Sequence, residues 1–551
     1  DSMDGERSCR LRLPFQLPTG HRHMFRKTAS FIAIIAIGVP GHSTLLPAQD
    51  QQNTRYQRID GTRPRNVIFI LADDHRYDFM GFTGKVPGLA TPNMDRLAKE
   101  GVVFQNAFVT TSLCSPSRAS ILTGQYVHTH TVVDNQAPEP GSLIFFPQYL
   151  QKQGYQTAFL GKWHMGGNSD DPRAGFDRWV SFRGQGIYYN PLLNIDGQHV
   201  QYGDSSYITD VLTDLALDWL EKRNKDKPFF MYLSHKAVHA EFLPAQRDKG
   251  KYKDLQIQYP VSMFNTAGPG SKQFTSGKPA ESQYTVNYRD IPQWVRARRN
   301  SSSGVDFMFQ GLYSRSDVDF TFQGPTDFDR FYQDYLETLS GIDNSIGRVM
   351  AFLEKNGLDK ETLIIYGSDN GFAFGEHGLI DKRDAYEESM RIPLLARWPG
   401  MIRPETRIRQ MVLNIDIAPT ILEIAGVSKP AQMQGQSFLP LLREKSTPWR
   451  DRVFYEYYWE DAFPQTPTQF AVRTDRYKFI RSQGIWDINQ LYDLQQDPHE
   501  MNNLIRSPKH QDIAAQLNRE LWDWLEKTNG LQIPLKRITA KKSDHLFRTT
   551  W

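Results

Sequence analysis

The sequence predicts an α/β fold, in which a doubly wound and mostly parallel sheet has helices on both faces. It also predicts a smaller C-terminal antiparallel sheet with one helix. Two observations indicate this. Apolar runs of strand length, each ending in polar residues, alternate with segments of helical periodicity. After Pro399 the pattern changes to short β-like runs followed by one helical segment.

Four apolar runs predict the central strands. They contain few polar residues and little alternation, which is typical of strands buried on both faces of a parallel sheet. In such sheets the active site lies beyond the carboxyl ends of the strands. The runs occupy residues 66–74, 156–164, 228–239 and 362–370. Their polar tails should therefore meet, and they carry Asp73, Asp74, Lys162, His164, His239, Asp369 and Asn370.

Helical patterns separate these runs. They occupy residues 91–100, 207–222 and 329–356, and the last of them has apolar residues near a 3.6-residue spacing. Beyond residue 400, we expect a short helix over residues 414–426. The C-terminal sheet is predicted from β-like runs at 453–459, 469–482 and 490–494, with its helix at 512–527.

The chain organisation follows from these elements. We expect a catalytic domain at residues 65–400, with an insertion at about 249–324 that is rich in Ser, Gly, Gln and aromatic residues. Loops of that length are usually functional or disordered. A C-terminal subdomain should span residues 401–535, and residues 536–551 form a tail.

The N-terminal residues predict export. Arg26 and Lys27 precede an apolar stretch at 31–39, and Ala48 suits a cleavage site, so residues 24–48 are interpreted as a signal peptide. Residues 1–23 are then a misassigned start or a cloning remnant. The alternative is an N-terminal membrane anchor, although nine apolar residues are too few to span a bilayer. A periplasmic or secreted protein without membrane attachment after cleavage is expected.

Composition excludes two classes. Lys and Arg number 65 against 62 Asp and Glu, so no polyanion-binding surface of the nucleic-acid kind is expected. The two cysteines, Cys9 and Cys114, exclude a disulfide framework.

The polar tails predict a metal site. Asp73, Asp74, Asp369 and Asn370 offer only oxygen ligands, which favour Ca²⁺, or less well Mg²⁺, over zinc or copper. Three converging carboxylates without a cation would repel one another. The alternative is that Asp73 only caps the helix that follows it.

Cys114 raises a separate question, because no His-plus-acid pair stands beside it in sequence to activate it. The stretch CSPSR (residues 114–118), followed by ASILTGQY, resembles the C-x-P-S-R signature of the type I, formylglycine-dependent sulfatases of the alkaline phosphatase superfamily. Gln125 stands where that signature often has arginine. The segments NVIFILADDHRYD, GKWHMG, SDNG and GEHGLIDKRDAYEESMRIPLL resemble further sulfatase blocks, and the resemblance covers roughly residues 65–505.

The resemblance implies a chemistry for this chain. A maturation enzyme would oxidise Cys114 to formylglycine, and the hydrated aldehyde would join the metal ligands and attack the sulfur of a sulfate ester. Its second hydroxyl would allow elimination of sulfate. Arg118 would hold the formylglycine, and Lys162 and Lys382 would bind sulfate oxygens. His239 would protonate the leaving alcohol and His164 would handle the diol proton, although these two roles could be exchanged.

The substrate is expected to be a sulfated polysaccharide or oligosaccharide. The predicted export, the aromatic insertion and the Trp459 and Trp486 region favour a carbohydrate, and the chain is similar to bacterial glycan sulfatases and N-acetylglucosamine-6-sulfatases. Asn190, His377 and Arg383 are candidate sugar contacts, and His377 could instead orient the GEHG loop.

Two alternative functions stay open. One is a phosphonate or phosphate monoester hydrolase of the same superfamily. The other is a secreted glycan-binding protein with an inactive sulfatase domain, which is disfavoured because none of the expected site residues is missing.

Overall fold

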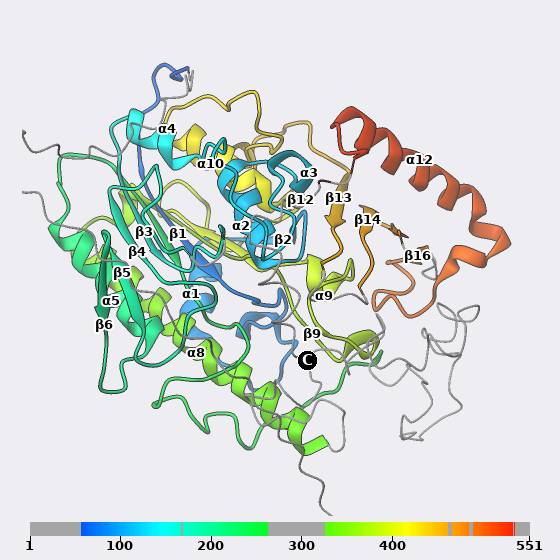
Figure 1. Ribbon diagram of the computed structural model, residues 1–551, viewed down its shortest axis with the longest axis horizontal. Coiled ribbons are helices and arrows are strands. Elements are labelled where there is room, and N and C mark those ends of the chain that lie inside the picture. The colour runs from blue at the N-terminus through cyan, green and yellow to red at the C-terminus, as the bar shows by residue number, and fades with distance from the viewer. Residues whose placement is uncertain are drawn as a thin grey trace, which may run out of the picture. The chain divides into compact units, whose positions relative to one another are not determined.

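The computed structural model of the chain describes residues 57–166, 169–262, 325–460, 466–483, 489–532 and 534, and Figure 1 shows the arrangement of their helices and strands. The predicted signal peptide, most of the insertion, the C-terminal tail and Trp486 lie outside these residues. Within them, no helix has both the length and the apolar character needed to cross a bilayer.

A ten-stranded mixed sheet organises the larger part of the fold. The four predicted runs are adjacent parallel strands at its centre, which confirms the predicted fold class. From edge to edge the sheet consists of β12 (Thr406–Leu413), β2 (Val102–Phe108), β11 (Leu394–Arg397), β8 (Thr362–Ser368), β1 (Asn66–Ala72), β7 (Phe229–Ser234), β3 (Gln156–Gly161), β4 (Arg178–Ser181), β5 (Leu192–Ile195) and β6 (Gln198–Gln201).

Helices cover both faces of this sheet (Figure 1). The described helices are α1 (Pro92–Lys99), α2 (Cys114–Thr123), α3 (Val127–His130), α4 (Pro147–Lys152), α5 (Ile208–Lys222), α8 (Pro325–Lys355), α9 (Glu387–Met390), α10 (Ile417–Ile424), α11 (Leu439–Leu442) and α12 (Gln511–Lys527).

Strand β1 shows why its sequence is apolar without alternation. Ile68 and Ile70 pack into a core that also contains side chains of α1, α5 and α8. Val67 and Phe69 point to the other face, into a core with side chains of α2, α4 and α10. Both faces of the strand are therefore buried, and a polar residue on either face would lie in an apolar core.

Six of the ten strands were not predicted: β2, β11 and β12 on one side of the central four, and β4, β5 and β6 on the other. Strand β11 pairs in antiparallel fashion with both β8 and β2, so the sheet is mixed. Strand β12 lies after residue 400, where we expected the C-terminal subdomain, and it pairs in parallel with β2. The smaller sheet therefore begins later in the chain, at Arg452.

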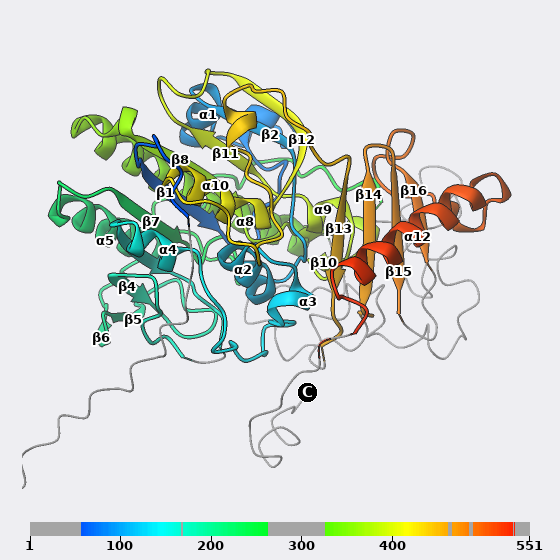
Figure 2. The same cartoon turned by 90° about the horizontal axis from the view of Figure 1, so that it is seen from above.

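The C-terminal sheet is antiparallel, with α12 packed against one of its faces (Figure 2). The predicted run at 469–482 forms two strands rather than one, because the chain turns at Asp475 and Arg476. Trp524 of α12 stacks on Phe454, with ring centroids 4.7 Å apart. The strands are β13 (Arg452–Tyr457), β14 (Gln469–Thr474), β15 (Tyr477–Ser482) and β16 (Gln490–Asp493).

Lys478 of β15 forms buried contacts between this sheet and the segment around residues 385–387, which follows β8 in sequence. Its ammonium is fully buried and lies 2.9 Å from a carboxylate oxygen of Glu387 and 2.8 Å from one of Glu500. It also donates to the carbonyl of Ala385 at 3.0 Å. Arg473 of β14 contacts the same Glu387 carboxylate at 3.1 Å. Buried ion pairs of this kind are costly to break singly, because the remaining charges lose their partners.

We therefore predict that Lys478→Met lowers the free energy of unfolding by about 3–5 kcal/mol, since two buried carboxylates lose their shared cation. Urea unfolding followed by tryptophan fluorescence measures this. Lys445→Met, at an exposed lysine, is the matched control and should leave the stability unchanged. Equal stability of the two variants would contradict the assigned role of Lys478.

Candidate functional site

The carboxyl ends of the four central strands bring the predicted polar residues to one edge of the sheet. Asp73 and Asp74 follow β1, and Asp369 and Asn370 follow β8. Lys162 and His164 follow β3, and His239 lies five residues after β7 ends at Ser234. Backbone hydrogen bonds continue past the strands here: Asp73 donates to the Ala237 carbonyl at 2.9 Å, and Lys162 donates to the Ser234 carbonyl at 2.8 Å.

Gly161 permits this close approach of β3 and β7. Its φ is +123°, and a Cβ at this position would lie 1.7 Å from the Ser234 carbonyl oxygen. Any side chain would therefore push β3 and β7 apart just before Lys162.

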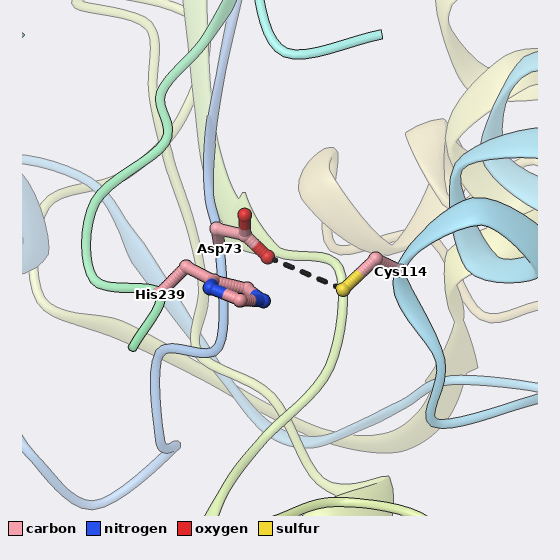
Figure 3. A group of neighbouring side chains, drawn as sticks. All are labelled: Asp73, Cys114 and His239. Atoms are coloured by element: carbon pink, nitrogen blue, oxygen red, sulfur yellow. Dashed lines mark hydrogen bonds between the residues drawn. The ribbon is translucent and has the colours of Figure 1, made fainter. Parts of the chain in front are cut away.

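Cys114 is the first residue of α2, and its side chain faces this edge. All ten residues of α2 are buried. The Cys114 thiol donates to Asp73 across 3.6 Å, and His239 lies in the same group (Figure 3). A helix N-terminus stabilises negative charge, so the position suits a group that becomes anionic during a reaction.

Three cations pair with the three carboxylates. Arg118 binds Asp369 through two nitrogens, at 2.9 and 2.8 Å. Lys382 lies 2.6 Å from both oxygens of Asp74. Lys162 forms a hydrogen bond with Asp73. All six of these side chains are buried, so each charge depends on the others.

The surroundings move the pKa values of the carboxyls in different directions. Burial opposes ionisation of Asp73, but Lys162 and other nearby cations outweigh it and hold its pKa well below the usual range. Burial raises the pKa of Asp74. Burial, together with the charge of Asp73, raises the pKa of Asp369 to about 7. Burial therefore favours the protonated forms of Asp369 and Asp74, and a cation bound beside them would oppose this effect.

The donor set fits a hard divalent cation. Oxygen atoms of Asp73, Asp74 and Asp369 lie within 4.8 Å of one another. The Asn370 amide donates to Asp74 at 2.7 Å, while its buried carbonyl oxygen has no hydrogen-bond partner among the described residues. Carboxylate and amide oxygens without thiolate or imidazole are the ligands that Ca²⁺ and Mg²⁺ prefer.

Both candidate histidines are held neutral. Burial, followed by the charge of Lys162, lowers the pKa of His164 and of His239 well below the usual value. His239 Nδ1 donates to the Ala240 carbonyl, and Nε2 lies 3.9 Å from Asp74. The Nδ1 of His164 has no partner in the described part of the chain.

Two backbone positions at the site are unusual. Asp74 and His164 adopt left-handed conformations, with φ of 62° and 65°. Such conformations cost about 1–3 kcal/mol for non-glycine residues and are concentrated at functional sites.

The candidate sugar contacts occupy different environments. His377 is 6% exposed and stacks on Tyr386 with ring centroids 3.9 Å apart, which leaves little of its surface for a sugar. Arg383 is buried and binds Glu460 and Asp381. Asn190 and Trp459 are exposed.

Two residues of the site, Ser234 and Lys236, were not predicted from the sequence. Ser234 accepts from Arg118 at 2.7 Å and donates to the Lys162 carbonyl at 2.9 Å. Lys236 is buried beside Tyr188. Both Ser234 and Lys236 lie in the run SHKAVH that ends at His239, and this proximity was the available signal.

The chain is similar to two N-acetylglucosamine-6-sulfatases over most of its length. It is 34% identical over 505 residues to an N-acetylglucosamine-6-O-sulfatase of Bacteroides thetaiotaomicron, which covers 86% of this chain and 87% of that protein. It is 32% identical over 434 residues to the N-acetylglucosamine-6-sulfatase of Homo sapiens. This alignment covers 74% of this chain and 70% of the human protein.

A solved structure and two family models agree with these relatives. A structure described as a complex with its substrate D-glucosamine-2-N,6-O-disulfate superposes with a TM-score of 0.72 at 33% identity, and covers 86% of this chain and 100% of that one. The C-terminal model of N-sulphoglucosamine sulphohydrolase matches residues 375–527. The sulfatase model matches residues 65–427. The chain belongs to the sulfatase family and is a sulfuric ester hydrolase.

Proposed function

We propose that this protein hydrolyses sulfate esters of a sulfated glycan, with the 6-O-sulfate of a glucosamine residue as the first substrate to test. The observation that carries the proposal is the position of Cys114, at the N-terminus of α2 and against Asp73, in a site that contains three buried cations. The similarity to N-acetylglucosamine-6-sulfatases over most of the chain supports the choice of sugar.

The cysteine is proposed to be a precursor of formylglycine. Burial raises the pKa of the Cys114 thiol to about 12, so the unmodified residue would carry almost no thiolate at neutral pH. A thiol of this kind is a poor nucleophile. Conversion by a maturation enzyme would replace it with an aldehyde, whose hydrate has two hydroxyls: one to attack sulfur and one to lose its proton as sulfate is expelled.

Asp73, Asp74, Asp369 and Asn370 would hold Ca²⁺, together with an oxygen of the modified residue 114. A bound divalent cation supplies Lewis-acid stabilisation of negative charge at this position. Arg118 keeps Asp369 oriented through a hydrogen bond from Nε and an ion-pair contact from Nη2.

The remaining polar side chains have roles that follow from their chemistry. Lys162 and Lys382 would bind the sulfate oxygens, where negative charge grows as the ester bond breaks. A histidine at the leaving oxygen would move a proton to the released alcohol. We assign this to His239, which would need to be in its imidazolium form when substrate is bound, because the Nδ1–H of the neutral ring is donated to the Ala240 carbonyl. The diol proton is assigned to His164. Arg383 is the proposed sugar contact beside Lys382.

Export to the periplasm or the outside of the cell is proposed as well. The apolar segment near the N-terminus supports it. Sulfated polysaccharides are also too large to cross a membrane unaided.

Cys114→Ala should lower kcat for N-acetylglucosamine-6-sulfate by at least about 1000-fold, because the nucleophile is lost. Sulfate release measured by ion chromatography checks this, using protein made together with a formylglycine-generating enzyme. The folded state is monitored by circular dichroism. Residual turnover within tenfold of the unaltered protein would exclude a nucleophile derived from Cys114.

The same assay distinguishes the phosphonate alternative. A sulfatase should have a higher kcat/KM for an aryl sulfate than for the matching aryl phosphonate monoester, and the reverse order would favour a phosphonate hydrolase.

Asp369→Ala should lose bound calcium and activity together, because the site loses one of its three carboxylates. Elemental analysis by mass spectrometry after dialysis gives the calcium content. Asp210→Ala is the control, since Asp210 pairs with Arg247 in an exposed ion pair and should keep its calcium. Full calcium occupancy in the Asp369 variant would show that this carboxylate is not a ligand.

A further inference from the structure

Lys236 is a buried lysine at the edge of the site, and the chemistry proposed above does not use it. It lies two residues after the end of β7, and its side chain is 4% exposed. Its neighbours in sequence belong to the site: Ser234 binds Arg118, and the Ala237 carbonyl accepts from the Asp73 backbone. The residue therefore emerges at the same carboxyl edge as Asp73 and Lys162.

Tyr188 holds the Lys236 ammonium in place. The Nζ atom lies 4.6 Å from the centroid of the Tyr188 ring. The Tyr188 hydroxyl donates to the His239 carbonyl at 2.7 Å, so the ring is fixed against the loop that carries His239. A cation over an aromatic face is stabilised by the ring, but by less than burial without a counter-ion destabilises an ammonium.

No carboxylate in the described part of the chain forms an ion pair with Lys236. The other cations of the site, Arg118, Lys162 and Lys382, each have a carboxylate partner. These three pairs balance one another in charge, so Lys236 adds a positive charge that they do not neutralise.

The electrostatic surroundings agree with this description. Burial, followed by the neighbouring charge of Lys162, lowers the pKa of Lys236 to about 8, although Asp73, Glu241 and Asp74 oppose the shift. Lys236 in turn contributes to the lowered pKa of His239. The contacts that join Lys236 to Tyr188, and Tyr188 to the His239 carbonyl, place the lysine beside the loop that carries a reacting group.

We propose that Lys236 determines specificity by binding a second anionic group of the substrate sugar, beside the sulfate ester that is cleaved. The inference rests on the proposed function and deepens it. The anion would supply the counter-charge that the protein lacks at this position. A sugar of this chemistry is bound in the similar structure described above, as D-glucosamine-2-N,6-O-disulfate.

Binding measurements on an inactive background test this without turnover. Calcium-loaded Cys114→Ala protein, with and without Lys236→Met, is titrated calorimetrically with glucosamine-2-N,6-O-disulfate and with N-acetylglucosamine-6-sulfate. The measured quantity is the ratio of the two affinities. Lys236→Met should lower the preference for the disulfate by about 10- to 100-fold, because one charge-assisted hydrogen bond is lost.

Two further variants separate binding from folding. Lys236→Arg keeps the charge and should retain most of the preference for the disulfate. Lys222→Met removes an exposed lysine, with 73% side-chain exposure, and should leave the ratio unchanged.

The outcomes divide clearly. An affinity ratio that stays within threefold in Lys236→Met overturns the inference, whether both affinities fall together or neither changes. Failure of the Cys114→Ala protein to bind either sugar overturns it as well. Selective loss of disulfate binding supports it. The proposed function is tested separately. If Lys236 determines the ratio of the two affinities but the protein with intact Cys114 releases no sulfate, the proposed function is contradicted and this inference stands.

Discussion

The site depends on the neutralisation of three buried carboxylates at one edge of the sheet. Asp73, Asp74 and Asp369 lie close together because parallel strands deliver the residues after their carboxyl ends to the same place. Without compensation they would not remain ionised in an apolar interior. Arg118, Lys162 and Lys382 supply part of that compensation, and the raised pKa of Asp369 indicates that more positive charge can be accommodated. An anionic substrate and a divalent cation both suit such a site.

The C-terminal sheet contributes to this arrangement from a distance. Lys478 and Arg473 bind Glu387, and Lys478 also binds Glu500 and the Ala385 carbonyl. These contacts fix the segment that follows Lys382 in sequence. Glu460, three residues after the end of β13, accepts a hydrogen bond from Arg383. The smaller sheet thus helps to position Lys382, the proposed sulfate-binding lysine, and Arg383, the proposed sugar contact, although it supplies none of the proposed metal ligands.

Much of this could be predicted from the sequence, for a physical reason. A strand buried on both faces gives a continuous apolar run, and the polar residues after it mark the functional edge of the sheet. The four central strands and the polar residues at their carboxyl ends were therefore recognisable. The other six strands were not, because β4, β5, β6 and β11 are only four residues long, and β2 and β12 mix buried residues with partly or fully exposed ones. Ser234 and Lys236 were overlooked because their roles depend on partners distant in sequence, Arg118 and Tyr188.

The central claim is that Cys114 is the precursor of the nucleophile. The most direct test is mass spectrometry of the tryptic peptide that ends at Arg118, from protein produced together with a formylglycine-generating enzyme. The account predicts that sulfur is lost from residue 114 and that an aldehyde replaces it, trapped by a hydrazide probe. An unmodified thiol under conditions that convert a known sulfatase would contradict the account.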